Sequence, residues 1–287
     1  MRIVVLGSRG QLGRDLVPRL PGDVIPLTRT EIDLEQPQSL LEQLTALKPD
    51  IVINCAAYNL VDKAETEPDL AWRVNAIGVR DLASATQNIG ARFVHFSTDY
   101  VFGLDSGRGT PLGETSLPGP VSVYGASKLA GEQLALAANP QTVVIRTCGL
   151  YGVWGSGGKG GNFVETMLRL AGQGKPLKVV DDQLCTPTST VDLAEATVKL
   201  LATGATGLFH ITNAGATTWF QLAREIFHRS QFNVDLKPIS SVEFNAPARR
   251  PSYSVLDCGK LAGFGIILPK WDDALGKYLV ERRSRSA

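Results

Sequence analysis

Residues 2–16 read RIVVLGSRGQLGRDL, an apolar run followed by three spaced glycines and a helical pattern. The β-branched run predicts a buried strand, and leucines at 12, 16 and 20 predict one face of a helix. Between strand and helix, Gly7, Gly10 and Gly13 permit a tight turn whose N–H groups approach a phosphate closely. Glycines often serve turns alone, but the strand–turn–helix order is the context that a dinucleotide site requires. The opening of the chain therefore predicts dinucleotide binding.

The stretch after the second expected strand indicates which dinucleotide is bound. Residues 23–27, DVIPL, are consistent with a strand, and Pro26 places it at a sheet edge or a strand end. NAD-selective sites often have a carboxylate after this strand, but here the chain has Thr28 and Arg29. Arg29 would attract the 2′-phosphate that a carboxylate repels, although the nearby Glu31 could neutralise it. We therefore favour NADP(H) as the cofactor, with NAD(H) as the alternative.

The next segment, DLEQPQSL at 33–40, predicts a helix that begins at an aspartate. Aspartate is a preferred N-cap residue because its carboxylate accepts hydrogen bonds from the free N–H groups of the first turn. Since this segment follows the second strand closely, we also expect Asp33 and Leu34 to contact the adenine end of the cofactor.

Strand-like runs alternate with helical patterns along the chain, and the clearest long helix is expected at 70–88. This alternation predicts an α/β fold with a doubly wound parallel sheet of the Rossmann type. We expect a dinucleotide-binding domain at 1–149 and 179–214. A smaller substrate-binding lobe is expected at 150–178 and 215–287. The expected strands are 2–6, 24–27, 50–54, 91–97, 142–146 and 207–212, with helices at 162–172 and 219–230 and a glycine-rich loop at 151–161.

Composition narrows the class of protein. The chain has 287 residues and a net charge of +1, which gives no strong field to recruit nucleic acid or an anionic membrane. No apolar run approaches the roughly 20 residues that a spanning helix needs, and the chain starts with a strand and not a signal segment. The four cysteines show no metal or redox spacing, and we expect Cys55 and Cys148 to be buried free thiols. The three histidines are too dispersed for a metal site, so His95 and His210 are expected to be structural. We predict a cytoplasmic protein without a metal site.

Tyr124 and Lys128 lie four residues apart in VYGASKLAGE, a stretch rich in good helix formers. Side chains at this spacing share one face of a helix. The pKa of a free tyrosine is about 10, and a nearby ammonium lowers it, so this phenol could act as a general acid. The alternative is a surface tyrosine beside a solvated lysine, and the four-residue spacing alone would not exclude it.

A set of segments that runs in order from near Met1 to about Leu256 carries a more specific signal. The chain resembles the extended short-chain dehydrogenase/reductase superfamily and, within it, the dTDP-4-dehydrorhamnose reductase family. The glycine turn and the Tyr–Lys pair are shared by the superfamily, whereas STDYVF, VDKAE, NFxxTML and DDQxxxPT are narrower and favour the family. The segments are GSRGQLG, NCAAYNLVDKAETEP, VNAIG, FVHFSTDYVFG, VYGASKLAGE, RTCGLYG, GGNFVETMLRLA, VVDDQLCTPT and RPSYSVLD.

The resemblance implies that NAD(P)H reduces the 4-keto group of a nucleotide-linked deoxysugar, with a dTDP-linked sugar as the favoured partner. By this resemblance, Tyr124 is the proton donor and Lys128 binds the nicotinamide ribose and lowers the tyrosine pKa. Thr98 hydrogen-bonds the substrate oxygen, and Asp99 and the position of Gly149 also contact the substrate. Further cofactor contacts implied by the family are Gln11, Leu12, Ala56, Ala57, Tyr58 and Phe96.

Two positions need separate comment. In familiar members of the family an RTSW-type segment places a tryptophan near the sugar or base, but here Gly149 takes its place. A glycine cannot stack on a ring, so Tyr151 or Trp154 from the adjacent loop would have to substitute. Asn75 resembles the asparagine that shapes the helix behind the site, and the alternative for it is a helix-surface amide.

Two other functions stay open. One is a non-catalytic regulatory protein, like the beta subunit of methionine adenosyltransferase, which resembles the same family. The other is a nucleotide-sugar epimerase or dehydratase, which would retain NAD tightly through its cycle. The chain is expected to be a monomer or a homodimer.

Overall fold

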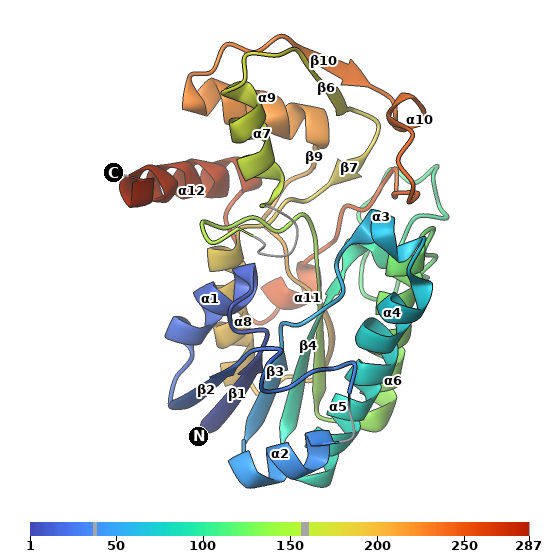
Figure 1. Cartoon of the computed structure of the whole chain (residues 1–287), viewed down its shortest axis with the longest axis vertical. Coiled ribbons are helices and arrows are strands. Elements are labelled where there is room, and N and C mark those ends of the chain that lie inside the picture. The colour runs from blue at the N-terminus through green and yellow to red at the C-terminus, as the bar shows by residue number, and fades with distance from the viewer. Residues whose placement is uncertain (37–38, 156–160, 287) are drawn as a thin grey trace.

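The computed structural model describes residues 1–36, 39–155 and 161–286, and its centre is a six-stranded parallel sheet (Figure 1). The strands are β1 (Arg2–Leu6), β2 (Asp23–Leu27), β3 (Ile51–Asn54), β4 (Arg92–Thr98), β5 (Thr142–Thr147) and β8 (Gly207–His210). Their order is β2-β1-β3-β4-β5-β8, so the direction of winding reverses between β1 and β3. All six expected strands form, and the predicted doubly wound fold is confirmed. Ligands of such sheets bind at the carboxyl edge beside the reversal.

Helices cover both faces of this sheet. They are α1 (Gln11–Leu16), η1 (Val17–Arg19), α2 (Leu40–Leu47), α3 (Val61–Ala64), α4 (Pro68–Trp72), α5 (Gly78–Asn88), η4 (Asp99–Val101), α6 (Val123–Ala138), α8 (Thr190–Ala202) and α11 (Gly259–Ala262). Ile3 and Val5 pack against α1 and α8, whereas Val4 and Leu6 face α2 and α5, on the opposite side in Figure 1. This alternation buries the sheet on both faces. No helix within the described ranges is long and apolar enough to cross a membrane.

A smaller lobe with its own apolar core lies beyond the carboxyl edge of the sheet (Figure 1). It contains α7 (Phe163–Ala171), β6 (Leu177–Val180), β7 (Leu184–Cys185), β9 (Thr217–Thr218), α9 (Trp219–Ser230), β10 (Leu236–Ile239), α10 (Ser241–Phe244) and α12 (Trp271–Ser286). β6 pairs with β10 in parallel, and β7 pairs with β9 in the antiparallel sense. Because β6 runs across position 178, and α11 packs on the main sheet, the division into two domains stays a prediction.

Three local expectations can be compared with the structure. Pro26 is exposed in β2, which is an edge strand, as predicted. The helix expected to begin at Asp33 is wrong: the Asp33 carboxylate accepts from the N–H of Glu35 at 3.0 Å in a local turn, and α2 begins only at Leu40. The helices expected at 162–172 and 219–230 are confirmed as α7 and α9, each capped by a side chain of the preceding residue.

The long helix expected at 70–88 is interrupted. It forms as α4 and α5, joined by a π-helical turn η3 (Arg73–Ile77). Such turns occur often at functional sites because they redirect one side chain out of helical register. The glycine-rich loop expected at 151–161 is described only at 151–155 and 161, since 156–160 lie outside the described residues.

Candidate active site

The glycine turn between β1 and α1 has the shape of a phosphate cradle. Gly7 has a φ of +70°, and a Cβ added there would lie 2.8 Å from the backbone nitrogen of Ala56. A Cβ on Gly13 would lie 2.5 Å from the Gly7 carbonyl oxygen, so α1 approaches the turn only because this residue is glycine. The N–H of Gly10 donates to the same oxygen at 2.9 Å and closes the turn. Because the glycines of this turn carry no side chains, the space beside their backbone stays open for a pyrophosphate.

The two residues after Gly10 have partners elsewhere in the protein. Gln11 donates through Nε2 to the carbonyl of Leu150 at 3.0 Å, and its Oε1 accepts from Asn162 at 2.9 Å. Leu12 is buried in the apolar core between α1 and the sheet, so only its backbone can face a ligand. Gln11 therefore ties the glycine turn to the segment after β5 and to the cap of α7.

Carboxylates surround the arginine expected to select NADP(H). Arg29 is 71% exposed and pairs with Asp33 at 3.1 Å and with Glu35 at shorter range. Glu31, which the sequence offered as the neutralising group, instead accepts from the Thr28 backbone N–H at 2.7 Å. Leu34 is buried in the core beside α2 and α5, and its expected contact with the adenine stays a prediction. A 2′-phosphate here would have to draw Arg29 away from two acidic partners.

Helix α6 carries both Tyr124 and Lys128 in its first turns. Its start is fixed by two side chains: Ser122 Oγ accepts from the N–H of Gly125 at 3.2 Å, and Glu65 Oε1 accepts from the N–H of Val123 at 2.8 Å. Because these acceptors satisfy the free N–H groups, the helix begins where the Tyr–Lys pair needs it.

Lys128 is not a solvated surface lysine. It is only 2% exposed, and its Nζ donates to the carbonyl of Phe96 at 2.7 Å and lies 3.1 Å from His95 Nε2. Burial lowers its pKa to about 8, while the negative charge of Glu132 acts in the opposite direction. The Phe96 side chain packs in the core, so this residue reaches the site through its backbone.

Tyr124 differs from its expected titration. Burial raises the pKa of its phenol to about 12, and a hydrogen bond with the Thr98 hydroxyl acts in the opposite direction. The pKa of this phenol is therefore raised and not lowered, because desolvation is the largest contribution. The ring of Tyr100 meets that of Tyr124 edge-on at 5.8 Å. The phenol therefore holds its proton at neutral pH.

Asp99 is buried, and its carboxylate accepts hydrogen bonds from three neighbouring side chains. Its Oδ2 accepts from Ser254 Oγ at 2.6 Å and from Cys148 Sγ at 3.0 Å, and its Oδ1 accepts from Thr98 Oγ1 at 3.1 Å. Desolvation raises its pKa, although these hydrogen bonds oppose the change. The carboxylate thus anchors Thr98, and a substrate contact would compete with three donors. Cys148 is buried as predicted, whereas Cys55 is half-buried.

Asn75 lies in the π-helical turn and is fully buried, so the helix-surface alternative is wrong. Its side chain exchanges two hydrogen bonds of 2.9 Å with the backbone of Tyr58 and donates to Ser127 Oγ at 3.1 Å. The loop after β3 is thereby held against α6. Within that loop Ala56 is half-buried and Ala57 is exposed.

The sequence did not single out three charged residues that shape this region. Arg250 makes two hydrogen bonds of 3.0 Å to the carboxylate of Asp62, which also accepts from the N–H of Ala248 at 3.2 Å. Glu65 caps α6. Asp62 and Glu65 belong to the VDKAE segment, so the motif was visible but the roles of its acids were not.

Gly149 lies at φ +53°, and the space beside it is already filled. A Cβ there would lie 3.2 Å from both Pro187 Cα and Trp219 Cη2. The aromatic ring next to Gly149 therefore comes from α9. Neither expected substitute supplies it: Tyr151 is buried against Tyr278, and Trp154 donates to Asp15 at 3.0 Å.

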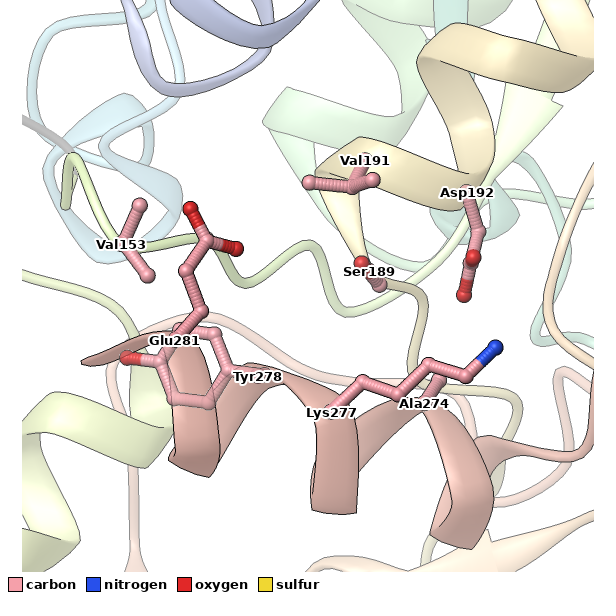
Figure 2. A pocket seen from close by; sticks show the side chains of 9 residues that line it. Val153, Ser189, Val191, Asp192, Ala274, Lys277, Tyr278 and Glu281 are labelled. Atoms are coloured by element: carbon pink, nitrogen blue, oxygen red, sulfur yellow. The ribbon is translucent and has the colours of Figure 1, made fainter. Parts of the chain in front are cut away.

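Two hollows among the described residues do not have Tyr124 or Lys128 in their linings. One of about 50 Å³ lies between α12 and the start of α8, and it has room for little more than water (Figure 2). A larger one of about 420 Å³ lies behind the segment 253–262 and does not include Tyr124, Thr98 or Lys128 in its lining. Figure 2 shows Val153, Ser189, Val191 and Asp192 opposite Ala274, Lys277, Tyr278 and Glu281.

At the carboxyl edge of the sheet, a glycine cradle and a Tyr–Lys pair on the same molecule define a class: the NAD(P)-dependent oxidoreductases of the short-chain dehydrogenase/reductase type. Within that class, the family model described as the RmlD substrate binding domain matches residues 1–284. The chain belongs to this family.

Individual relatives agree over the full length. The chain is 38% identical to the spore coat polysaccharide biosynthesis protein SpsK of Bacillus subtilis, over 99% of this chain and 98% of that protein. A solved dTDP-4-dehydrorhamnose reductase from Clostridium acetobutylicum is 40% identical, with a TM-score of 0.93, and covers 99% of this chain and 100% of its own. The Bacillus anthracis dTDP-4-dehydrorhamnose reductase, solved in complex with NADP, is 37% identical, with a TM-score of 0.91 and coverage of 98% and 99%.

Proposed function

We propose that this protein uses NADPH to reduce the 4-keto group of a dTDP-linked 4-keto-6-deoxy sugar, the reaction of dTDP-4-dehydrorhamnose reductase. Full-length similarity to proteins of that name, one solved with NADP, supports the reaction and the cofactor. Within the chain, the main support is that α6 carries both Tyr124 and Lys128, and that Lys128 fastens this helix to Phe96 near the carboxyl end of β4, where Thr98 lies. A keto oxygen needs donors such as a phenol and a hydroxyl while negative charge grows on it.

Some of the residues bind the substrate or cofactor, and one transfers the proton. When bound, the reduced nicotinamide supplies the hydride that reaches the keto carbon. Tyr124 holds the proton for the keto oxygen, because its raised pKa keeps the phenol neutral until that oxygen becomes basic. We assign Thr98 to the same oxygen; its single hydroxyl proton, which is donated to Asp99 Oδ1 in this structure, would have to turn toward the substrate. We assign Lys128 to the ribose beside the nicotinamide.

The cofactor is assigned to the residues named from the sequence, with limits set by the geometry. The backbone of the glycine turn would hold the pyrophosphate, and Arg29 would hold the 2′-phosphate after leaving Asp33 and Glu35. The loop at 56–58 would lie along the nicotinamide half, where Asn75 supports it. We assign Trp219, which lies beside Gly149, to the aromatic contact that the family makes with the sugar or base.

A spectrophotometric assay tests the proposal. Purified protein is offered dTDP-4-keto-6-deoxy-L-mannose with NADPH and, separately, with NADH. We expect oxidation of NADPH that depends on the sugar nucleotide. Oxidation of neither cofactor would reject the proposal and favour the non-catalytic regulatory function, whereas tightly retained NAD in the purified protein would favour an epimerase or dehydratase.

Replacement of Tyr124 by Phe tests the acid. Proton transfer from a positioned acid contributes roughly 100- to 10,000-fold, so we expect Tyr124→Phe to lower kcat by about that factor. Affinity for NADPH, measured by fluorescence titration, should change little, because the ring remains. Tyr151→Phe is the matched control, since Tyr151 is a buried tyrosine whose ring packs against Tyr278 in the smaller lobe. Near-normal turnover in Tyr124→Phe would mean that another group donates the proton.

A further inference from the structure

Lys128 ends a row of three buried polar side chains, and the other two, Asn54 and His95, are not used by the proposed mechanism. The row runs from Asn54 at the end of β3, through His95 in β4, to Lys128 in α6. Asn54 Nδ2 lies 3.2 Å from His95 Nδ1, and Lys128 Nζ lies 3.1 Å from His95 Nε2. All three residues are at most 2% exposed, so no solvent relaxes the hydrogen bonding between them.

The orientation of the Asn54 amide is fixed by the backbone. Its Oδ1 accepts from the N–H of Ala56 at 3.0 Å, and a backbone N–H can only donate. The amide oxygen must therefore face Ala56, which leaves the amide nitrogen facing His95. Since that nitrogen can only donate, His95 Nδ1 must accept.

An accepting Nδ1 determines where the histidine carries its proton. Because Nδ1 accepts, it carries no proton and the ring is neutral, and burial of the ring also lowers the pKa of His95. A neutral imidazole has one N–H, and with Nδ1 accepting, that N–H is on Nε2. The Nε2–H group points at Lys128 Nζ.

Lys128 must match this donor. An ammonium group has three N–H donors and no lone pair, so it cannot accept from His95 Nε2–H. A neutral amine can accept that hydrogen bond and still donate to the carbonyl of Phe96 at 2.7 Å. Every donor among Asn54, His95 and Lys128 therefore faces an acceptor only when Lys128 is uncharged.

The charges around Lys128 do not reverse this conclusion. Glu132, one turn further along α6, carries the opposite charge nearby, but its carboxylate is held by three hydrogen bonds from Arg146. Tyr124, one turn earlier, is a neutral phenol at neutral pH. Burial lowers the pKa of Lys128 to about 8, which by itself would leave the ammonium predominant at pH 7. The hydrogen bond that Nζ accepts from His95 must therefore lower this pKa further, and the inference rests on that geometry.

We infer that Asn54 and His95 act as positioning residues that hold Lys128 as a neutral amine, so that the protein must take up a proton at Lys128 before an ammonium can act beside Tyr124. The proton comes from water and adds to the lone pair of Nζ, which then gives up its hydrogen bond from His95. Only the kinetic consequence of this inference rests on the proposed function.

The first test needs no turnover. Nitrogen NMR of the purified protein, labelled with 15N-histidine and without added nucleotide, reports which ring nitrogen carries the proton. His210→Gln and His228→Gln assign the signals by removal, since the chain has three histidines. We expect His95 in the Nε2–H form at neutral pH. An Nδ1–H form would overturn the inference.

The second test measures Lys128 itself. Carbon NMR of 13C-lysine-labelled protein, assigned with Lys128→Arg, follows its protonation against pH. In His95→Gln the new amide can turn its oxygen toward Nζ and accept from an ammonium. We therefore expect the protonation midpoint of Lys128 to rise by about one pH unit or more, a tenfold gain in proton affinity. An unchanged midpoint would overturn the inference.

The third test is kinetic and separates this role from a merely structural one. The basic limb of the pH profile of kcat/KM reports the free protein, so it should move to higher pH in His95→Gln by the same amount as the NMR midpoint. His210→Gln, a second fully buried histidine in the same sheet, is the matched control and should leave the limb in place. Equal shifts in both variants would mean that any buried substitution moves the limb, and would reject the role of His95. Because the two NMR tests do not depend on catalysis, failure of the proposed reaction would leave them decisive.

Discussion

Single residues with unusual backbone conformations give the sharpest stability test. Gly149 lies at φ +53°, where any side chain costs about 1–2 kcal/mol, and a Cβ would also press on Pro187 and Trp219. Gly204 has a similar φ of +76° with open space around it. We expect Gly149→Ala to lower the unfolding free energy in urea by more than Gly204→Ala does, with the difference due to the two contacts. Equal losses of unfolding free energy in the two variants would show that Pro187 and Trp219 move aside without cost.

At the scale of residues, the main site residues were predictable from the sequence, but many of the residues that hydrogen-bond to them were not. Tyr124, Lys128 and the glycine turn were found because their spacing alone restricts their chemistry. The residues that hold them come from distant positions: Asn54 contacts His95 across 41 residues, and Arg250 contacts Asp62 across 188. His95 was taken as structural because an isolated histidine in an apolar strand carries no signal of the lysine it will meet.

At the scale of elements, α6 depends on one buried ion pair. Glu132 on α6 and Arg146 on β5 are at most 1% exposed and approach to 2.6 Å. Removal of one partner leaves the other charge buried and unpaired, which costs about 3–5 kcal/mol. We expect Glu132→Gln to lower the unfolding free energy by about that amount, measured by urea titration. Glu281→Gln, which breaks the exposed pair with Arg285, is the control and should cost at most about 1 kcal/mol. A small loss in Glu132→Gln would mean that water reaches Arg146.

Strands were easier to predict than the starts and interiors of helices. The six strands follow from β-branched runs, and α9 follows from Thr218 and Gln221, which form a capping box. The helix at 33–40 failed because Asp33 satisfies a nearby N–H in a turn, which is the same chemistry that makes it a good cap. The π-helical turn has no local signature, since the packing of Asn75 against Tyr58 and α6 favours it.

For the whole molecule, the parallel sheet and its two helical layers followed from the alternation of patterns, whereas the lobe boundaries did not. Segments at 177–180 and 236–239 form one small sheet although 55 residues separate them, and no local pattern predicts that pairing. The pairing of these two segments, and with it the extent of the lobe, is therefore known only from the assembled chain.

Acid stability is also a property of the whole molecule, because it sums every buried group whose proton affinity changes on folding. His95 and His210 are fully buried, and desolvation lowers both pKa values, that of His210 to about 3. The unfolded chain takes up these protons near pH 6.5 while the native protein does not, so stability is complete above that pH and is lost as the pH falls. Asp99, whose pKa is raised, acts in the opposite direction, since its native state keeps a proton that the unfolded chain has released.

We therefore expect the unfolding free energy to fall below about pH 6 by about 1.4 kcal/mol per pH unit for each buried histidine, partly offset by Asp99. Urea titrations between pH 7 and 4.5 at constant salt measure this slope. In His210→Gln the slope should decrease by about 1.4 kcal/mol per pH unit, the contribution of one histidine. This holds even though the variant is itself less stable at pH 7, because the slope depends only on the difference in bound protons between the native and unfolded states. If the slope were unchanged, His210 would have to take up its proton within the native fold, and the burial that sets its pKa would not hold in solution.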